Sequence, residues 1–250
     1  MIVTTFSTAC TSLKGARSAE DLFAYLAAVL SHPGYTSAFA ADLAVPGLRV
    51  PVTAEPEMFR HAVTIGRRVL WLHSYGQHFH DPADNRLKSP PRLPHDRAPK
   101  VLGGYPIPGD PEHMPDALGY DPGKHELSVG GGHIGNVTPR MREYDISGVN
   151  VLNKWFSYRR RNRERPPMGA RRFSPLQEIQ AKSWLAEYTS ELIDLLHVLG
   201  LLVDLEPEQA QLLTAIVDGS LISVDDLTSA KLSFRDLGRR TSPGPGRTPR

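Results

Sequence analysis

The sequence WLAEYTSELIDLLHVLGLLVDLEP, residues 184–207, decides the fold. Its large apolar residues recur at helical spacing: Trp184, Tyr188, Leu192, Leu195 and Leu199. This period predicts a long amphipathic helix that buries one face. Ser174-Pro175 is a typical N-cap and first-turn pair, and Glu206-Pro207 predicts the start of a second helix. We therefore expect a leucine-rich helical subdomain over residues 174–230.

Residues 81–137, before this subdomain, predict loops and a small sheet. The first part, 81–115, contains nine prolines, so we expect it to be mostly irregular, with a short strand near 101–105. Two strand patterns, 117–120 and 125–129, flank the turn sequence DPGK, and a third short strand follows near Ile134. These features predict a small antiparallel sheet.

The N-terminal part predicts helices. Ser18 and Asp21 form a capping-box pattern, and residues 53–73 hold the best helical period of this half. The fold class is therefore α+β: a helical N-terminal part, a sheet in a loop-rich middle and a helical C-terminal part. Residues 1–17 stay unassigned, and we expect the basic tail at 231–250 to be disordered.

The composition excludes several classes of protein. The single cysteine, Cys10, excludes an internal disulfide and a four-cysteine zinc site, and it favours a reducing, cytoplasmic compartment. No apolar run approaches the roughly 18 residues of a membrane span, so we expect no membrane partner. The net charge of +2 is unremarkable.

Motifs for catalysis and cofactor binding are absent from the sequence. It contains no P-loop, no dinucleotide-binding glycine pattern after a strand and no nucleophile elbow. The glycines at 130–132 are interpreted as tight turns. His73, His78, His80 and Asp81 lie close together, but their spacing matches no metal motif. We therefore predict no cofactor, no metal and no enzymatic activity for this chain.

The strongest chemical signal is the basic segment KWFSYRRRNRERPPMGARR, residues 154–172. Residues 149–161, which include its start, are expected to form a helix with Val149, Leu152 and Trp155 or Phe156 inward. The basic segment has eight basic residues and one acid, whereas residues 174–230 have ten acids and one base. Arginine binds phosphate oxygens in pairs and reads guanine edges, and aromatic rings stack on bases. Two interpretations remain open. The segment contacts nucleic acid, or its arginines pair with the acidic helices while its aromatic residues join the core.

The first interpretation gives a set of candidate DNA-binding residues. They are Asn153, Lys154, Tyr158, Arg159, Arg160, Arg161, Asn162, Arg163, Arg171 and Arg172. We expect the cations to hold phosphates, with Arg159 or Arg161 also reading bases and the two asparagines pairing with adenine. For Trp155 and Tyr158 a structural role is favoured over stacking on bases.

Four stretches of the sequence carry a family resemblance. They are DLFAYLAAVLSHPGY (21–35), LRVPVT to IGRRVLWLHSYG (48–76), EYDISGVNVLNKWFSYRRRN (143–162) and SPLQEI to LVDLEP (174–207). In this order and spacing the chain resembles the C-terminal specificity domain of type ISP restriction–modification enzymes, over residues 20–227. Those enzymes join a nuclease and a helicase-like ATPase to an adenine N6-methyltransferase, followed by this target-recognition domain.

The resemblance implies a non-catalytic domain that recognises a short sequence in double-stranded DNA and presents it to the methyltransferase. Residues 18–173 would be the target-recognition region. The chain itself lacks the methyltransferase and Walker motifs. A specificity subunit that docks onto a separately encoded methyltransferase or helicase–nuclease, or a truncated fragment, therefore remains the alternative.

Overall fold

A computed structural model describes residues 18–47, 49–161, 181–223 and 226. The chain divides into two compact units, one within Met1–Val69 and Glu208–Arg250 and the other within Leu70–Pro207. The α+β class is confirmed. The expectations for residues 1–17, for Ser174-Pro175 and for the tail at 231–250 lie outside the described residues.

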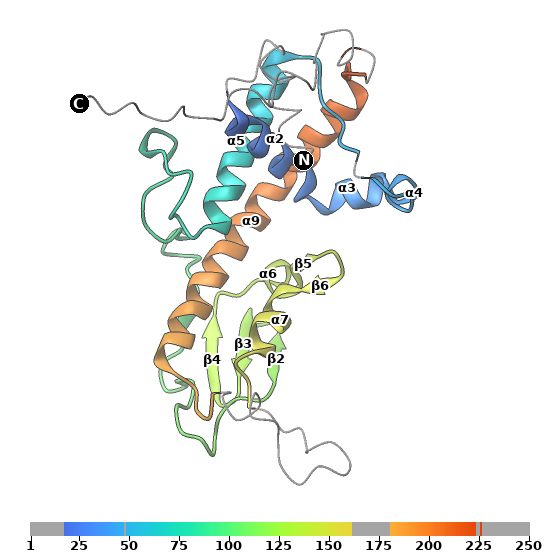
Figure 1. Ribbon diagram of the computed structural model, residues 1–250. Helices are drawn as coiled ribbons and strands as arrows, with labels where there is room; N and C mark the ends of the chain where they lie inside the picture. The colour runs from blue at the N-terminus through green and yellow to red at the C-terminus, as the bar shows by residue number, and fades with distance from the viewer. Residues whose placement is uncertain (1–17, 48, 162–180, 224–225, 227–250) are drawn as a thin grey trace, which may run out of the picture. The chain divides into compact units, whose positions relative to one another are not determined.

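The first unit is helical (Figure 1). Its elements are α2 (Ala19–Leu30), α3 (Pro33–Ala38), α4 (Ala40–Leu43), most of α5 (Pro56–His73) and the C-terminal part of α9 (Ala186–Asp218). The predicted capping box is present: the side chains of Ser18 and Asp21 each accept a hydrogen bond from the other residue's backbone N–H. This pairing fixes the start of α2.

Close packing of α2 against α5 holds the first unit together. A Cβ added at Gly66 would lie 1.7 Å from the carbonyl oxygen of Ala24, so no larger residue fits there. The ring of Tyr25 stacks on Phe59 at 4.8 Å, and its hydroxyl donates to the Pro51 carbonyl at 2.8 Å. The extended segment before α5 is thereby attached to α2.

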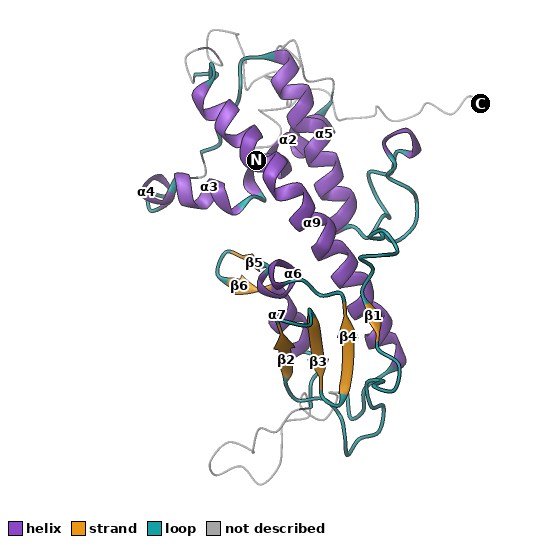
Figure 2. Cartoon of the chain, turned by 180° about the vertical axis from the view of Figure 1, so that it is seen from behind, coloured by secondary structure: helices purple, strands orange, loops and turns teal. Residues whose placement is uncertain are grey.

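The second unit contains the predicted sheet (Figure 2). Its antiparallel strands lie in the order β1-β4-β3-β2, and they are β1 (Lys100–Val101), β2 (Leu118–Asp121), β3 (Glu126–Val129) and β4 (Gly132–Gly135). The hairpin between β2 and β3 has the expected turn, in which Asp121 accepts hydrogen bonds from the N–H groups of Gly123 and Lys124. Residues alternate along β3 so that Leu127 and Val129 are buried.

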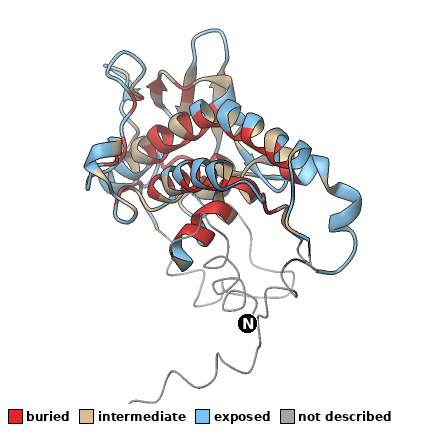
Figure 3. Cartoon of the chain, turned by 90° about the horizontal axis from the view of Figure 1, so that it is seen from above, coloured by how far each residue is buried: buried red, intermediate tan, exposed pale blue. Residues whose placement is uncertain are grey.

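One face of this sheet is covered by helices. The buried cluster on that face joins residues of β3 and β4 to α6 (Pro139–Glu143), α7 (Val151–Ser157) and α9. Its members are Leu93, Leu127, Val129, Ile134, Val137, Met141, Leu152, Phe156, Trp184, Leu192, Leu195, Leu196 and Leu199. In Figure 3 red buried and pale-blue exposed segments alternate along the helices, as amphipathic elements require.

Three predicted boundaries were wrong. The strand expected near 101–105 ends at Val101, because a turn follows in which Tyr105 N–H donates to Leu102 and Gly104 has a φ of +85°. The helix expected over 149–161 is α7, and a short hairpin of β5 (Asp145–Ile146) and β6 (Val149–Asn150) precedes it. Asn150 supplies the N-cap of α7.

The third wrong boundary is Pro207, which does not start a new helix but lies inside α9, a helix of 33 residues. A proline inside a helix costs about 3 kcal/mol, because it removes one hydrogen bond and crowds the preceding turn. Buried residues continue on both sides, with Leu202 and Leu205 before Pro207 and Leu212 and Ile216 after it. Burial of these side chains, at roughly 1.5–3 kcal/mol each, exceeds the local cost.

None of the described helices combines the length and the apolar character that crossing a bilayer would need.

Candidate nucleic-acid interface

The short helix α7 places the first part of the predicted basic segment. The side chain of Asn150 accepts a hydrogen bond from Asn153 N–H, which starts the helix, and Leu152 and Phe156 enter the core. With these two residues directed inward, Asn153, Lys154 and Ser157 are exposed. Helical geometry thus separates a structural face from a solvent face within seven residues.

Arg159, which follows α7, binds the protein. Its Nε and Nη2 donate to Glu191 Oε2 of α9 at 3.1 and 2.8 Å, and its Nη1 donates to the Trp155 carbonyl at 3.1 Å. The guanidinium also lies 4.2 Å from the Trp155 ring centre and 5.5 Å from that of Tyr188. These contacts occupy N–H groups that Arg159 would need in order to hydrogen-bond to a base.

The neighbouring cations Lys154, Arg160 and Arg161 are more exposed than Arg159 and make fewer contacts with the protein. Lys154 of α7 and Tyr158, its C-cap residue, form an exposed pair, with Lys154 Nζ 5.0 Å from the Tyr158 ring centre and Tyr158 69% exposed. Arg160 is exposed, and its guanidinium has no hydrogen bond or ion pair within the described part of the chain. Arg161 is exposed too, but its Nη1 donates to the Glu112 carbonyl at 2.9 Å.

The remaining predicted site residues divide into two groups. Asn153 accepts a hydrogen bond from Arg142 Nη2 at 3.0 Å, which joins α7 to α6. Asn162, Arg163, Arg171 and Arg172 lie outside the described residues. Of the described candidates, the structure brings Lys154 and Tyr158 into contact, and Arg160 and Arg161 are exposed just after α7.

Four of the seven acids of α9 form ion pairs with arginines, three of which the sequence did not single out. Beside Arg159–Glu191, the ion pairs are Arg92–Asp194, Arg97–Asp204 and Arg140–Glu206. Arg97 binds both oxygens of Asp204, at 3.0 and 2.8 Å. The interpretation in which arginines pair with the acidic helices therefore holds for Arg159. The other three pairs join residues between 66 and 107 positions apart, where no local pattern gives a signal.

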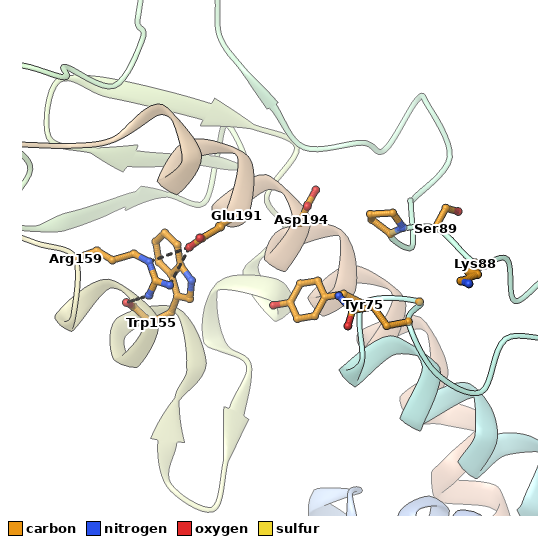
Figure 4. A pocket seen from close by; sticks show the side chains of 10 residues that line it. Tyr75, Lys88, Ser89, Trp155, Arg159, Glu191 and Asp194 are labelled. Carbon is orange, nitrogen blue, oxygen red and sulfur yellow. Dashed lines mark hydrogen bonds and ion pairs between the residues drawn. The ribbon is translucent and has the colours of Figure 1, made fainter. Parts of the chain in front are cut away.

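A pocket of about 650 Å³ lies beside Arg159 (Figure 4). It is lined by residues that follow α5, by a loop and by α7 and α9: Tyr75, Gly76, Gln77, Lys88, Ser89, Pro90, Trp155, Arg159, Glu191 and Asp194. Burial raises the pKa of the Tyr75 phenol, and the carboxylates of Asp194 and Glu191 raise it further. Tyr75 therefore presents a protonated hydroxyl at neutral pH. The sequence had not pointed to these wall residues other than Trp155 and Arg159.

Within the described residues no three His, Cys, Asp or Glu side chains converge on a position that would hold a metal ion. Asp81, from the histidine-rich stretch, binds Arg86 and caps the short helix η1 (Pro82–Asp84) instead.

Fold and surface together define a class: an α+β domain that carries exposed cations at the end of a helix anchored in its core. Residues 2–195 match the family described as the Type ISP C-terminal specificity domain. The chain therefore belongs to the type ISP C-terminal specificity domain family. This family is a non-catalytic domain of restriction–modification enzymes, and membership supports a role in DNA target recognition.

A solved structure is also similar to the chain. It is a nuclease-deletion mutant of the Type ISP restriction-modification enzyme LlaGI in complex with a DNA substrate mimic, with 16% identity and a TM-score of 0.46. The match covers 78% of this chain and 13% of that chain, so this chain spans a small part of that enzyme's length. A search of curated proteins finds no match.

Proposed function

We propose that this chain recognises a specific sequence in duplex DNA and presents the DNA to an adenine N6-methyltransferase and ATP-dependent nuclease. Membership of the specificity-domain family, over residues 2–195, is the observation that carries this proposal. The chain supplies no catalytic group in this view. Its contribution is the affinity for DNA and the choice of sequence.

In this proposal Lys154, Arg160 and Arg161 contact phosphates and set the position of the domain on the duplex. The three side chains are exposed and lie within eight residues of the chain. Arg159 has a different role from the one expected, because its donors are bound to Glu191 and Trp155. It supports the surface rather than reading a base.

The other candidate residues stay predictions. Asn153 is joined to Arg142, so reading adenine would require that bond to break. Tyr158 is exposed enough to stack against a sugar or a base. Asn162, Arg163, Arg171 and Arg172 continue the basic segment and add positive charge to the proposed interface.

Salt dependence of duplex binding tests the proposed phosphate contacts. In the double variant Lys154→Ala/Arg160→Ala we expect weaker binding and a salt slope reduced by roughly two, since each phosphate contact contributes about 0.9 to the slope. The matched control is Arg60→Ala/Arg68→Ala, which removes two exposed cations from α5. Equal losses in both double variants, or none in either, would contradict the proposal.

Selection from a random duplex library tests the sequence specificity. Enrichment of one short sequence by the intact 250-residue chain is the expected result. Recovery of a random pool after repeated rounds would leave only non-specific binding and would reject target recognition by this chain alone.

The alternative, a specificity subunit that docks onto a separately encoded methyltransferase through its acidic helices, has less support. Four of the seven acids of α9 are paired with arginines of the same chain, which leaves three exposed acids, Glu187, Glu208 and Asp218, without an ion pair within the described residues. Docking through the acidic helices would have to rely on these three carboxylates.

A further inference from the structure

The pocket beside Arg159 has two opposite walls of different origin. One wall is formed by Tyr75, which follows α5, and by the loop at Lys88–Pro90; the other is formed by Trp155 and Arg159. Figure 4 shows the Tyr75 ring pointing toward the side where Arg159 and Trp155 lie. The volume of about 650 Å³ is within the range of roughly 300–1,000 Å³ that holds small organic molecules.

The walls are held in place by the fold. Tyr75 has a φ of +52°, and Gly76 N–H donates to the Trp71 carbonyl, so the chain turns sharply at the end of α5. A Cβ at Gly76 would lie 2.0 Å from the Ser89 carbonyl oxygen, which shows how closely the two segments pack. On the other side Trp155 meets Trp184 edge to face at 6.2 Å.

Two carboxylates of α9 supply hydrogen-bond acceptors to the pocket, and the negative charge of each is balanced by an arginine. Arg159 donates hydrogen bonds only to Oε2 of Glu191, and Arg92 donates only to Oδ1 of Asp194. The second oxygen of each carboxylate has no hydrogen bond within the described residues. Because each charge already has an arginine partner, the site suits a neutral donor better than a cation.

We infer that this pocket binds an unstacked nucleobase that carries an exocyclic amino group, as cytosine, adenine and guanine do. Tyr75 and Trp155 provide aromatic surface for the base, and Glu191 and Asp194 accept from its amino group. The inference rests on the proposed DNA binding and adds to it a pocket for a base beside the proposed phosphate contacts. Thymine lacks an exocyclic amino group and binds more weakly.

The position of the pocket agrees with that of the proposed phosphate contacts. Trp155 and Arg159, four residues apart, line the pocket, and Lys154 and Tyr158, also four apart, form the exposed pair one position earlier. Neighbouring positions on a helix differ by about 100°, so Lys154 and Trp155 lie on adjacent faces of α7. A backbone held at Lys154 therefore brings its bases near the pocket.

Titration with free nucleosides tests the pocket without requiring duplex binding. Binding to the intact chain is measured by tryptophan fluorescence. We expect cytidine or adenosine to saturate a single site and thymidine to bind roughly tenfold more weakly. The variant Ser89→Phe places a ring in the pocket from an exposed loop position and should abolish saturation. Ser37→Phe, on the exposed surface of α3, is the matched control and should bind like the unmodified chain.

The outcomes separate this inference from the proposed function. Saturation by cytidine or adenosine that Ser89→Phe removes and Ser37→Phe leaves intact supports the pocket. No saturation, equal binding of thymidine, or binding that Ser89→Phe does not change overturns it. If the proposed function is wrong, the unmodified chain does not bind duplex DNA, whatever the nucleoside titration shows.

Discussion

The basic end of α7 and the acidic face of α9 look equivalent in the sequence, as two charged surfaces of opposite sign. The structure separates them. Four of the seven acids of α9 are paired with Arg92, Arg97, Arg140 and Arg159, whereas Lys154 and Arg160 of the basic segment form no ion pair within the described residues. A run of like charges therefore indicates a binding surface only after the partners inside the chain have been subtracted.

The same contrast exists within α7, between its buried and exposed faces. Leu152 is 1% exposed and packs in the cluster under the sheet, so Leu152→Ala should lower the free energy of unfolding by about 2–5 kcal/mol. Urea unfolding measures this loss. The control is Lys154→Ala, two positions along the helix, which should change stability by less than about 0.5 kcal/mol. A similar loss in both variants would mean that α7 does not divide into a structural face and a binding face.

Acid sensitivity is the second prediction, and it concerns the paired side of α9. His197 is buried, and its Nδ1 accepts a hydrogen bond from Leu93 N–H at 2.9 Å. Burial lowers the pKa of His197, and Arg92 lowers it further, while Asp194 acts in the opposite direction. A histidine whose folded pKa is depressed binds its proton more readily when unfolded. Stability is therefore complete above about pH 6.5 and falls as the pH drops below that value, by at most about 1.4 kcal/mol per pH unit.

Thermal unfolding between pH 7.5 and pH 5 measures this effect, by comparison with a variant that cannot titrate. In His197→Asn the side-chain oxygen is placed to accept from Leu93 N–H, so the hydrogen bond is kept while the proton site is lost. The pH dependence of the variant should be shallower than that of the unmodified chain. Identical curves would show that His197 does not link folding to pH.

The sequence predicted the helices and the sheet because their signals are local. The alternation at Leu127 and Val129, and the period from Tyr188 to Leu199 within α9, are visible within one segment. Trp184, the first residue of the predicted period, lies before the start of α9 at Ala186. The prediction that a new helix starts at Pro207 was wrong. The local cost of a proline can be read from the sequence, whereas the burial of leucines on both sides of it is a property of the folded chain.

The site was predictable only in part, for the same reason. The basic composition of residues 154–172 is visible in the sequence, and it includes Lys154 and Arg160. Which arginine is engaged depends on α9, 32 positions from Arg159. The pocket depends on Tyr75 and the loop at Ser89, far from α7 along the chain, so no local pattern could have indicated it.

The smallest expected effect distinguishes between two ion pairs of α9. Arg159–Glu191 has side chains 24% and 48% exposed and is supported by the Trp155 ring, whereas Arg97–Asp204 has both side chains about half exposed, at 51% and 43%. Double-mutant cycles with alanine should give a coupling energy of about 1 kcal/mol for the first pair and about 0.5 kcal/mol or less for the second. Raising the salt concentration should weaken the second pair more, because exposed charges are screened more strongly. A coupling energy for Arg159–Glu191 no larger than that for Arg97–Asp204 would mean that Arg159 is held weakly enough to leave Glu191 and contact DNA, which would restore it as a candidate base reader.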